Sequence, residues 1–173
     1  LGLDIGGTGI KGGVLINGHL EDIRSIATPA LESKEFILET IADFIRTYLQ
    51  YDIIGIGIGI PGLVNTIEGV VLGLANIPSF QHVELKKFLG ERFGLPVFVN
   101  NDANCFAIGV HKYGVGKPFK NLVGITLGTG TGGGIVINGH LYSGVNSAAG
   151  EWCSASYLDH NYEYYCSGKF FQN

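Results

Sequence analysis

The 173-residue sequence has no methionine, one tryptophan and only three cysteines. Cys105, Cys153 and Cys166 lie far apart without a Cys-x-x-Cys pair, so neither a disulfide framework nor a zinc knuckle is indicated. We therefore expect a reducing, cytoplasmic location. No apolar run reaches the roughly 18 residues of a spanning helix, so no membrane segment is expected. Because 11 lysines and arginines face 15 aspartates and glutamates, we expect no nucleic-acid partner for this segment.

Apolar residues make up 46% of the sequence and charged residues 15%, which is enough apolar side chain for a folded core. The missing methionine and the strand-like start at Leu1 to Ile5 lead us to expect a fragment of a longer chain.

Glycine, by contrast, is abundant and clustered. Of 28 glycines, 7 lie in residues 1–18, 6 in residues 55–73 and 9 in residues 124–150. Glycine clusters beside apolar strands indicate tight turns, or backbone that a ligand or a neighbouring element approaches closely.

Two of these clusters are copies of each other. When the sequence is shifted by 121 residues, 10 of the 15 positions in residues 6–20 are identical to their counterparts in residues 127–141. Each copy is typical of a strand, a Gly/Thr turn, a second strand, an Asn-Gly hairpin turn and a third strand. The sequence therefore predicts the opening hairpins of two similar lobes.

Between the copies the pattern alternates helices and strands. Ser33 can cap a helix with an apolar stripe at Ile37, Ile41, Ile45 and Leu49. Further elements are expected as a strand at 53–60, a helix at 83–93 closed by Gly94, a strand at 97–99 and a helix at 101–113. This order predicts a mixed α/β fold with one lobe over residues 1–116 and the start of a second over residues 117–173.

The two Gly/Thr turns have two interpretations. Free backbone N–H groups and a threonine hydroxyl suit phosphate oxygens, and two facing turns could hold the β- and γ-phosphates of one nucleotide. Alternatively, the glycines only form turns and close packing. Asp4 precedes the first turn and could hold Mg²⁺, directly or through water, or be a solvated turn residue. Lys11 could neutralise phosphate or simply be solvated.

Asp102 lies where a buried strand passes into a helix, at the strand end where ligands of α/β sheets bind. It can be a helix cap or a general base that takes a proton from an attacking hydroxyl. Asn100, Asn101 and Asn104 surround it and offer the amide donors and acceptors that a polyol requires. They favour the second role.

Together these residues resemble the ROK family of sugar kinases and repressors, in the actin-like ATPase superfamily. The matching segments come in family order and cover nearly the whole sequence: 4–11, 57–64, 101–104, 127–134 and 148–151. The resemblance implies an actin-like, ribonuclease H-like lobe that starts with three antiparallel strands and continues with alternating helices and strands, followed by the first part of a similar lobe.

The resemblance also implies an ATP-dependent kinase of a hexose or N-acetylhexosamine that uses Mg²⁺ and forms a homodimer. Asp102 would be the general base. The residues implied in sugar binding are Asn101, Gly62, Glu151, Ser154 and Glu163, and Glu163 could alternatively be a surface helix glutamate. Those implied on the phosphates are Gly6, Gly7, Thr8, Lys11, Gly128, Thr129 and Gly130, with Asp4 on the Mg²⁺.

One segment departs from the family pattern. Ser154 stands where the family has a histidine that contacts sugar and binds zinc, and downstream only Cys166 remains of a cysteine-rich zinc loop. We therefore expect no structural zinc. Aromatic residues crowd residues 152–171 and could replace the metal, although we interpret them first as ordinary core.

Two other functions stay open: a sugar-responsive repressor of the same family, and a non-catalytic sugar-binding module. Family repressors carry a DNA-binding segment ahead of the first strand, so the residues that precede Leu1 in the intact protein would identify one. Because family kinases continue with residues that hold the adenine, we expect residues 1–173 alone to bind ATP feebly and not to turn over.

Overall fold

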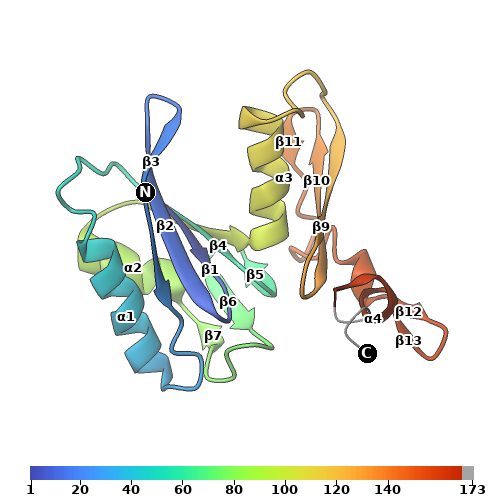
Figure 1. The fold of residues 1–173 in the computed structure, drawn as a ribbon, viewed down its shortest axis with the longest axis horizontal. Coiled ribbons are helices and arrows are strands. Elements are labelled where there is room, and N and C mark those ends of the chain that lie inside the picture. The colour runs from blue at the N-terminus through green and yellow to red at the C-terminus, as the bar shows by residue number, and fades with distance from the viewer. Residues whose placement is uncertain (169–173) are drawn as a thin grey trace. The chain divides into compact units, whose positions relative to one another are not determined.

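The computed structural model describes residues 1–168, and its contacts divide the chain into two compact units, Leu1–Asp102 and Ala103–Asn173 (Figure 1). Two of the aromatic residues noted above, Phe170 and Phe171, lie outside the described residues. No helix formed within residues 1–168 is both long and apolar enough to cross a membrane.

The first unit is built on one five-stranded mixed sheet. Its strands, in spatial order, are β3 (His19–Ala27), β2 (Gly9–Ile16), β1 (Gly2–Ile5), β4 (Ile56–Ile60) and β8 (Val97–Asn101). The first three pair antiparallel, whereas β4 runs parallel to both β1 and β8. The predicted antiparallel start followed by alternating strands and helices is confirmed.

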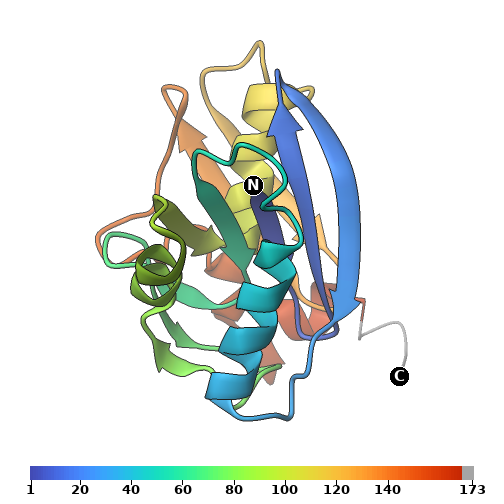
Figure 2. The same ribbon diagram turned by 90° about the vertical axis from the view of Figure 1, so that its left-hand side faces the viewer.

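Helices α1 (Lys34–Arg46) and α2 (Leu85–Phe93) cover the same face of this sheet (Figure 2). The Ser33 hydroxyl accepts a hydrogen bond from the Phe36 N–H at 3.2 Å and caps α1, as predicted. Three residues of the predicted stripe, Ile37, Ile41 and Ile45, are fully buried in the core between helix and sheet.

A second, three-stranded sheet in this unit was not predicted. It consists of β5 (Leu63–Asn65), β6 (Val70–Gly73) and β7 (Gln81–Val83), and it lies mostly between the expected strand at 53–60 and the expected helix at 83–93. Val83 therefore belongs to a strand, and α2 starts two residues later than expected.

Two other sequence expectations need correction. Leu49 lies beyond the end of α1 and is 51% exposed, so the buried stripe stops at Ile45. The fourth strand begins at Ile56 rather than at residue 53, because Ile54 is 88% exposed and residues 53–55 form no ladder.

The second unit starts inside α3 (Asp102–Tyr113) and continues with the sheet of β9 (Leu122–Leu127), β10 (Thr131–Ile137) and β11 (His140–Leu141). A short segment of η1 (Trp152–Ser154), β12 (Ser156–Tyr157), β13 (His160–Asn161) and α4 (Tyr162–Cys166) follows.

Glycine lets α3 lie directly on the second sheet. A Cβ atom on Gly134 would lie 2.6 Å from the Ala107 Cβ, and one on Gly124 would lie 2.9 Å from the same atom. By its contacts, α3 from Ala103 onward belongs to the second compact unit. The lobe boundary at 116/117 stays a prediction.

The duplicated hairpins are confirmed. Asn17 and Gly18 have φ angles of 49° and 83°, and their counterparts Asn138 and Gly139 have 53° and 80°. Two successive positive φ angles are those of the type I′ turn that an Asn-Gly pair favours.

Candidate active site

The predicted ligand-binding segments of the first unit lie along one edge of its sheet. Asp4 is in register with Gly59, Gly59 with Asn100, and Ile60 with Asn101. Since β1, β4 and β8 are parallel, the segments that follow them start at the same edge. The structure thus brings together the first Gly/Thr turn, the Pro61-Gly62 turn and Asp102.

A hydrogen bond joins two of the predicted sugar-binding residues. The Asn101 Nδ2 group donates to the Gly62 carbonyl oxygen at 3.1 Å, and Asn101 is 7% exposed. Gly62 has a φ angle of +80°, which a glycine adopts without strain. The buried amide therefore fixes the turn after β4 beside the end of β8.

Asp102 is the first residue of α3, and its side chain is exposed. A carboxylate in the first helical turn is favoured by the helix dipole. An exposed carboxylate at this sheet edge has the access to a ligand that a general base needs.

Thr28 holds the first Gly/Thr turn by two hydrogen bonds. Its hydroxyl donates to the Gly6 carbonyl at 2.6 Å, and its N–H donates to the Thr8 carbonyl at 3.2 Å. The Gly6 N–H closes the turn on the Gly9 carbonyl at 2.9 Å. Thr28 thereby engages two carbonyl oxygens that would repel an anion, which suits a turn predicted to bind phosphate. No sequence motif surrounds Thr28, so its role could not be predicted from the sequence.

Asp4 and Lys11 are direct neighbours on the paired strands β1 and β2, and both are exposed. Directly opposed residues of an antiparallel pair have Cβ atoms about 5 Å apart, so a carboxylate and an ammonium side chain start from neighbouring positions on the sheet. Mg²⁺ is usually held by one or two carboxylates together with phosphates and water. Asp4 offers one such carboxylate, and the neighbouring Lys11 offers a positive charge.

The second Gly/Thr turn is one residue shorter than the first. Leu127 pairs with Thr131 across it, so residues 128–130 form the turn, whereas residues 6–9 separate Ile5 from Ile10. The Gly128 N–H donates to the Gly130 carbonyl at 2.9 Å. Thr129 is exposed at its tip.

Glu163 reaches this second turn from α4. Its Oε2 atom accepts a hydrogen bond from the Thr131 N–H at 3.2 Å, and a Cβ atom on Gly130 would lie 2.9 Å from the same oxygen. The structure therefore places this predicted sugar-binding carboxylate beside a predicted phosphate-binding turn.

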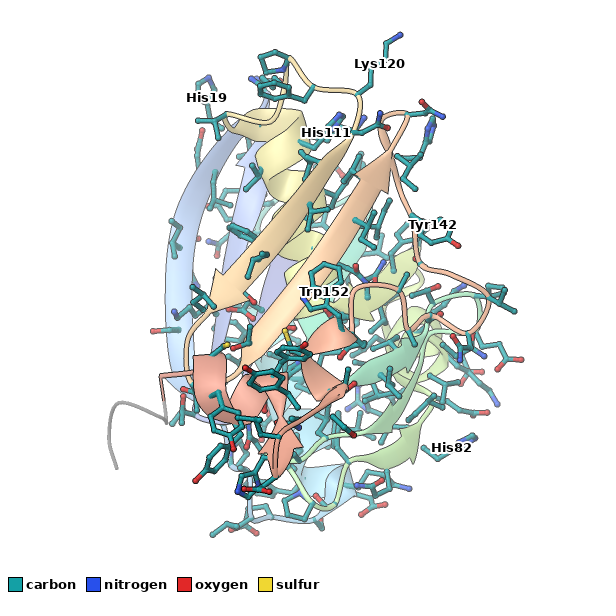
Figure 3. All side chains as sticks on the ribbon, turned by 90° about the vertical axis from the view of Figure 1, so that its right-hand side faces the viewer. His19, His82, His111, Lys120, Tyr142 and Trp152 are labelled. Atoms are coloured by element: carbon teal, nitrogen blue, oxygen red, sulfur yellow. The ribbon has the colours of Figure 1, made fainter. Side chains whose placement is uncertain are left out.

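Glu151 and Ser154 are joined through η1. The Ser154 hydroxyl donates to the Glu151 carbonyl at 2.7 Å, and the Ser154 N–H donates to the same oxygen at 3.2 Å. Gly150, with a φ angle of +96°, packs directly on the Gly133 backbone, and Trp152 packs on Gly133 as well. Figure 3 labels the Trp152 side chain. These contacts fix the chain on either side of Glu151 to β10.

The aromatic residues of this segment stack on one another at the surface. Tyr157 and Tyr162 are stacked with ring centroids 4.7 Å apart, and the His160 and Tyr164 rings are 3.9 Å apart. Tyr157, Tyr162 and Tyr164 are 42–45% exposed. The interpretation as ordinary core is therefore wrong for these side chains.

The residues of this segment do not fit a structural zinc site. Within residues 1–168, no group of three or more histidine, cysteine, aspartate or glutamate side chains could hold a metal ion. Burial raises the pKa of the Cys153 thiol, which disfavours the thiolate that zinc needs. The expected absence of zinc stays a prediction.

We expect 1,10-phenanthroline to leave the Tm of the protein unchanged, because stacked rings rather than a metal hold the segment together. Differential scanning calorimetry with and without the chelator measures this, and metal analysis of the untreated protein gives the zinc content. A fall in Tm that added zinc reverses would contradict the expectation.

A five-stranded sheet opened by a β-hairpin, followed by a second sheet with the same opening, defines an actin-like α/β fold. The model of the ROK family matches residues 1–167, and the chain belongs to this family.

Known proteins of this family resemble the chain closely. A glucokinase of Halalkalibacterium halodurans is 41% identical over 158 residues, which cover 87% of this chain and 48% of that protein. A xylose repressor of Bacillus spizizenii is 32% identical, covering 87% and 40%. The crystal structure of a ROK family glucokinase from Streptomyces griseus in complex with glucose and AMPPNP has a TM-score of 0.86 and 34% identity, covering 97% of this chain and 57% of that one. The chain thus spans about half the length of these proteins.

Proposed function

We propose that the protein containing this chain is an ATP-dependent kinase of a hexose or N-acetylhexosamine hydroxyl. The observation that carries the proposal is the hydrogen bond between Asn101 Nδ2 and the Gly62 carbonyl, at 3.1 Å, directly before the exposed Asp102. It holds the Gly62 turn beside the end of β8, so one polar turn, one buried amide and one carboxylate share a sheet edge with a turn that suits phosphate. Such an edge is where α/β proteins bind their ligands.

In the proposed reaction, a sugar hydroxyl oxygen attacks the γ-phosphorus atom of ATP. A new O–P bond forms, the bond between the γ-phosphorus and the β,γ-bridging oxygen breaks, and ADP leaves with those electrons. Asp102 accepts the hydroxyl proton as general base. Asn101 and the Gly62 turn orient the sugar, and Glu151 and Ser154 add contacts from the second unit. The base then contributes about 10²- to 10⁴-fold to the rate.

The phosphates are proposed to lie on the two Gly/Thr turns, at Gly6, Gly7 and Thr8 in the first unit and at Gly128, Thr129 and Gly130 in the second. Lys11 would neutralise part of their charge, and Asp4 would hold Mg²⁺, which supplies charge stabilisation to the phosphoryl group when bound. Glu163 would leave the Thr131 N–H for a sugar hydroxyl, which also removes its negative charge from the phosphate side.

The test is a coupled assay of ADP release by the intact protein over a panel of hexoses and N-acetylhexosamines. We expect ADP release that depends on one or a few of these sugars, with the phosphorylated sugar identified by mass spectrometry. ATP turnover that no sugar of the panel stimulates would reject the proposal. The proposal includes a homodimer, which size-exclusion chromatography with light scattering would show as twice the mass of one chain.

The similarity to a xylose repressor favours one second candidate, a sugar-responsive repressor. That function requires a DNA-binding segment in the intact protein, and sugar would change DNA affinity without being phosphorylated. A mobility-shift assay with and without sugar, run beside the kinase assay, separates the two.

A further inference from the structure

The segment between β6 and β7 runs alongside both ligand-binding turns of the first unit. A Cβ atom on Gly62 would lie 2.6 Å from the Gly73 carbonyl oxygen, so the sugar-side turn packs on the start of this segment. A Cβ atom on Gly7 would lie 2.5 Å from the Asn76 Cβ and 3.5 Å from its Nδ2 atom, so the phosphate-side turn packs on its middle. Asn76 therefore lies against the phosphate-side turn, on a segment whose start contacts the sugar-side turn.

Buried side chains on both sides fix the position of Asn76. Leu74 is 3% exposed, and Ile77 and Phe80 are fully buried in the core of the unit. The Phe80 N–H donates to the Ile77 carbonyl at 3.0 Å, and the Ser79 hydroxyl donates to the Glu32 carbonyl at 2.9 Å. The backbone at Asn76 is thus held in place before any ligand arrives, which lowers the entropic cost of using its side chain.

The glycine at position 7 is explained by this contact. Its φ angle is outside the positive range that favours glycine, so backbone conformation does not require one. What requires it is the close approach of Asn76. Asn76 is itself exposed, and its amide makes no hydrogen bond to any residue in 1–168. A preplaced amide with unused donors thus lies against the loop proposed to bind phosphate.

We propose that Asn76 is a phosphate-binding residue, which rests on the proposed kinase function. Its Nδ2 group donates a hydrogen bond to a terminal phosphate oxygen of the nucleotide held at Gly7. A hydrogen bond to a charged oxygen is stronger than one between neutral groups, and the amide adds no charge that would hold the product back.

The test compares Asn76→Asp and Asn76→Ala with the wild type in the intact protein. Aspartate has the shape of asparagine but lacks the donor and repels phosphate. We expect Asn76→Asp to weaken AMPPNP binding by about 10- to 100-fold and Asn76→Ala by about 10-fold, measured by isothermal titration calorimetry. AMP has no phosphate beyond the first and should bind all three proteins equally.

Gln50→Glu is the matched control, because it makes the same amide-to-carboxylate change in the same unit. Gln50 is exposed and lies directly before Tyr51, whose hydroxyl donates to Asp22 at 3.0 Å. Asp22 follows the Asn17-Gly18 turn, at the opposite end of β2 from Gly7. Gln50→Glu should bind AMPPNP as the wild type does. If Asn76→Asp fails to fold, judged by Tm, the Asn76→Ala arm decides.

The outcomes separate this inference from the kinase proposal. Three outcomes would each overturn the role of Asn76. The first is unchanged AMPPNP binding in Asn76→Asp, and the second is a loss of AMP binding as large as the loss of AMPPNP binding. The third is a raised KM for sugar at normal AMPPNP affinity. If the wild type binds AMPPNP but phosphorylates no sugar, the kinase proposal falls and Asn76 is judged on AMPPNP alone. A wild type that binds neither nucleotide would overturn both.

Discussion

Replacing Asp102 by asparagine in the intact protein is expected to lower kcat by about 10²- to 10⁴-fold, the contribution of a positioned general base. The amide keeps the size and the hydrogen-bonding shape of the side chain but cannot accept the hydroxyl proton. We expect the KM values for sugar and ATP to change little, because the lost interaction acts in the transition state. Steady-state kinetics of the purified variant measures all three constants.

The same variant separates the base from the helix cap. Asparagine caps a helix as well as aspartate does and loses only the helix-dipole contribution of about 0.3–1 kcal/mol, so a purely structural Asp102 would tolerate the change. Glu35→Gln is the control, since Glu35 is the acidic residue in the first turn of α1. Both variants should keep a Tm close to that of the wild type. Normal turnover in Asp102→Asn would remove Asp102 from the mechanism.

Much of the first unit could be predicted from local patterns. The Asn-Gly turns followed from the positive φ angles that this pair favours, and both have them. The α1 cap at Ser33 and the αL glycine that ends α2 at Gly94 followed from the same kind of rule. In each case the residue's own conformational preference decides the structure, so the sequence alone suffices.

Features that depend on distant residues were missed. Strands β5, β6 and β7 are only three or four residues long, too short for a period to be seen, and pairing with one another stabilises them. Thr28 supports the first Gly/Thr turn from 22 residues away, and Asn76 contacts Gly7 across a longer separation. No local motif marks either residue.

The role of each glycine could be predicted only in part from the sequence. Two interpretations were open for the glycine clusters: turns and close packing, or a phosphate cradle. Close packing explains some of these glycines but not all. Gly124 and Gly134 make room for Ala107 of α3, whereas Gly128 would meet no atom within 4 Å of an added Cβ. Composition identifies the cluster, but only the neighbours of each Cα assign a role. The same distinction predicts which glycines tolerate alanine.

Gly150→Ala is expected to destabilise the protein by roughly 3–5 kcal/mol, the largest stability effect we predict. Its φ angle of +96° is one that alanine adopts only with strain, and an added Cβ would collide with the Gly133 carbonyl. Because that atom belongs to the backbone of β10, no side chain can move aside. A loss of this size corresponds to a fall in Tm of about 10 °C in calorimetry of the intact protein.

Gly109→Ala supplies the matched comparison. Gly109 lies inside α3, has no positive φ angle, and an added Cβ would meet nothing within 4 Å. Alanine there should stabilise the protein by about 0.5–1 kcal/mol, since it favours the helix and restricts the unfolded chain. Opposite signs for one identical substitution would show that the Gly150–Gly133 contact holds the chain before Glu151. A Gly150→Ala variant as stable as Gly109→Ala would mean that this contact does not fix Glu151.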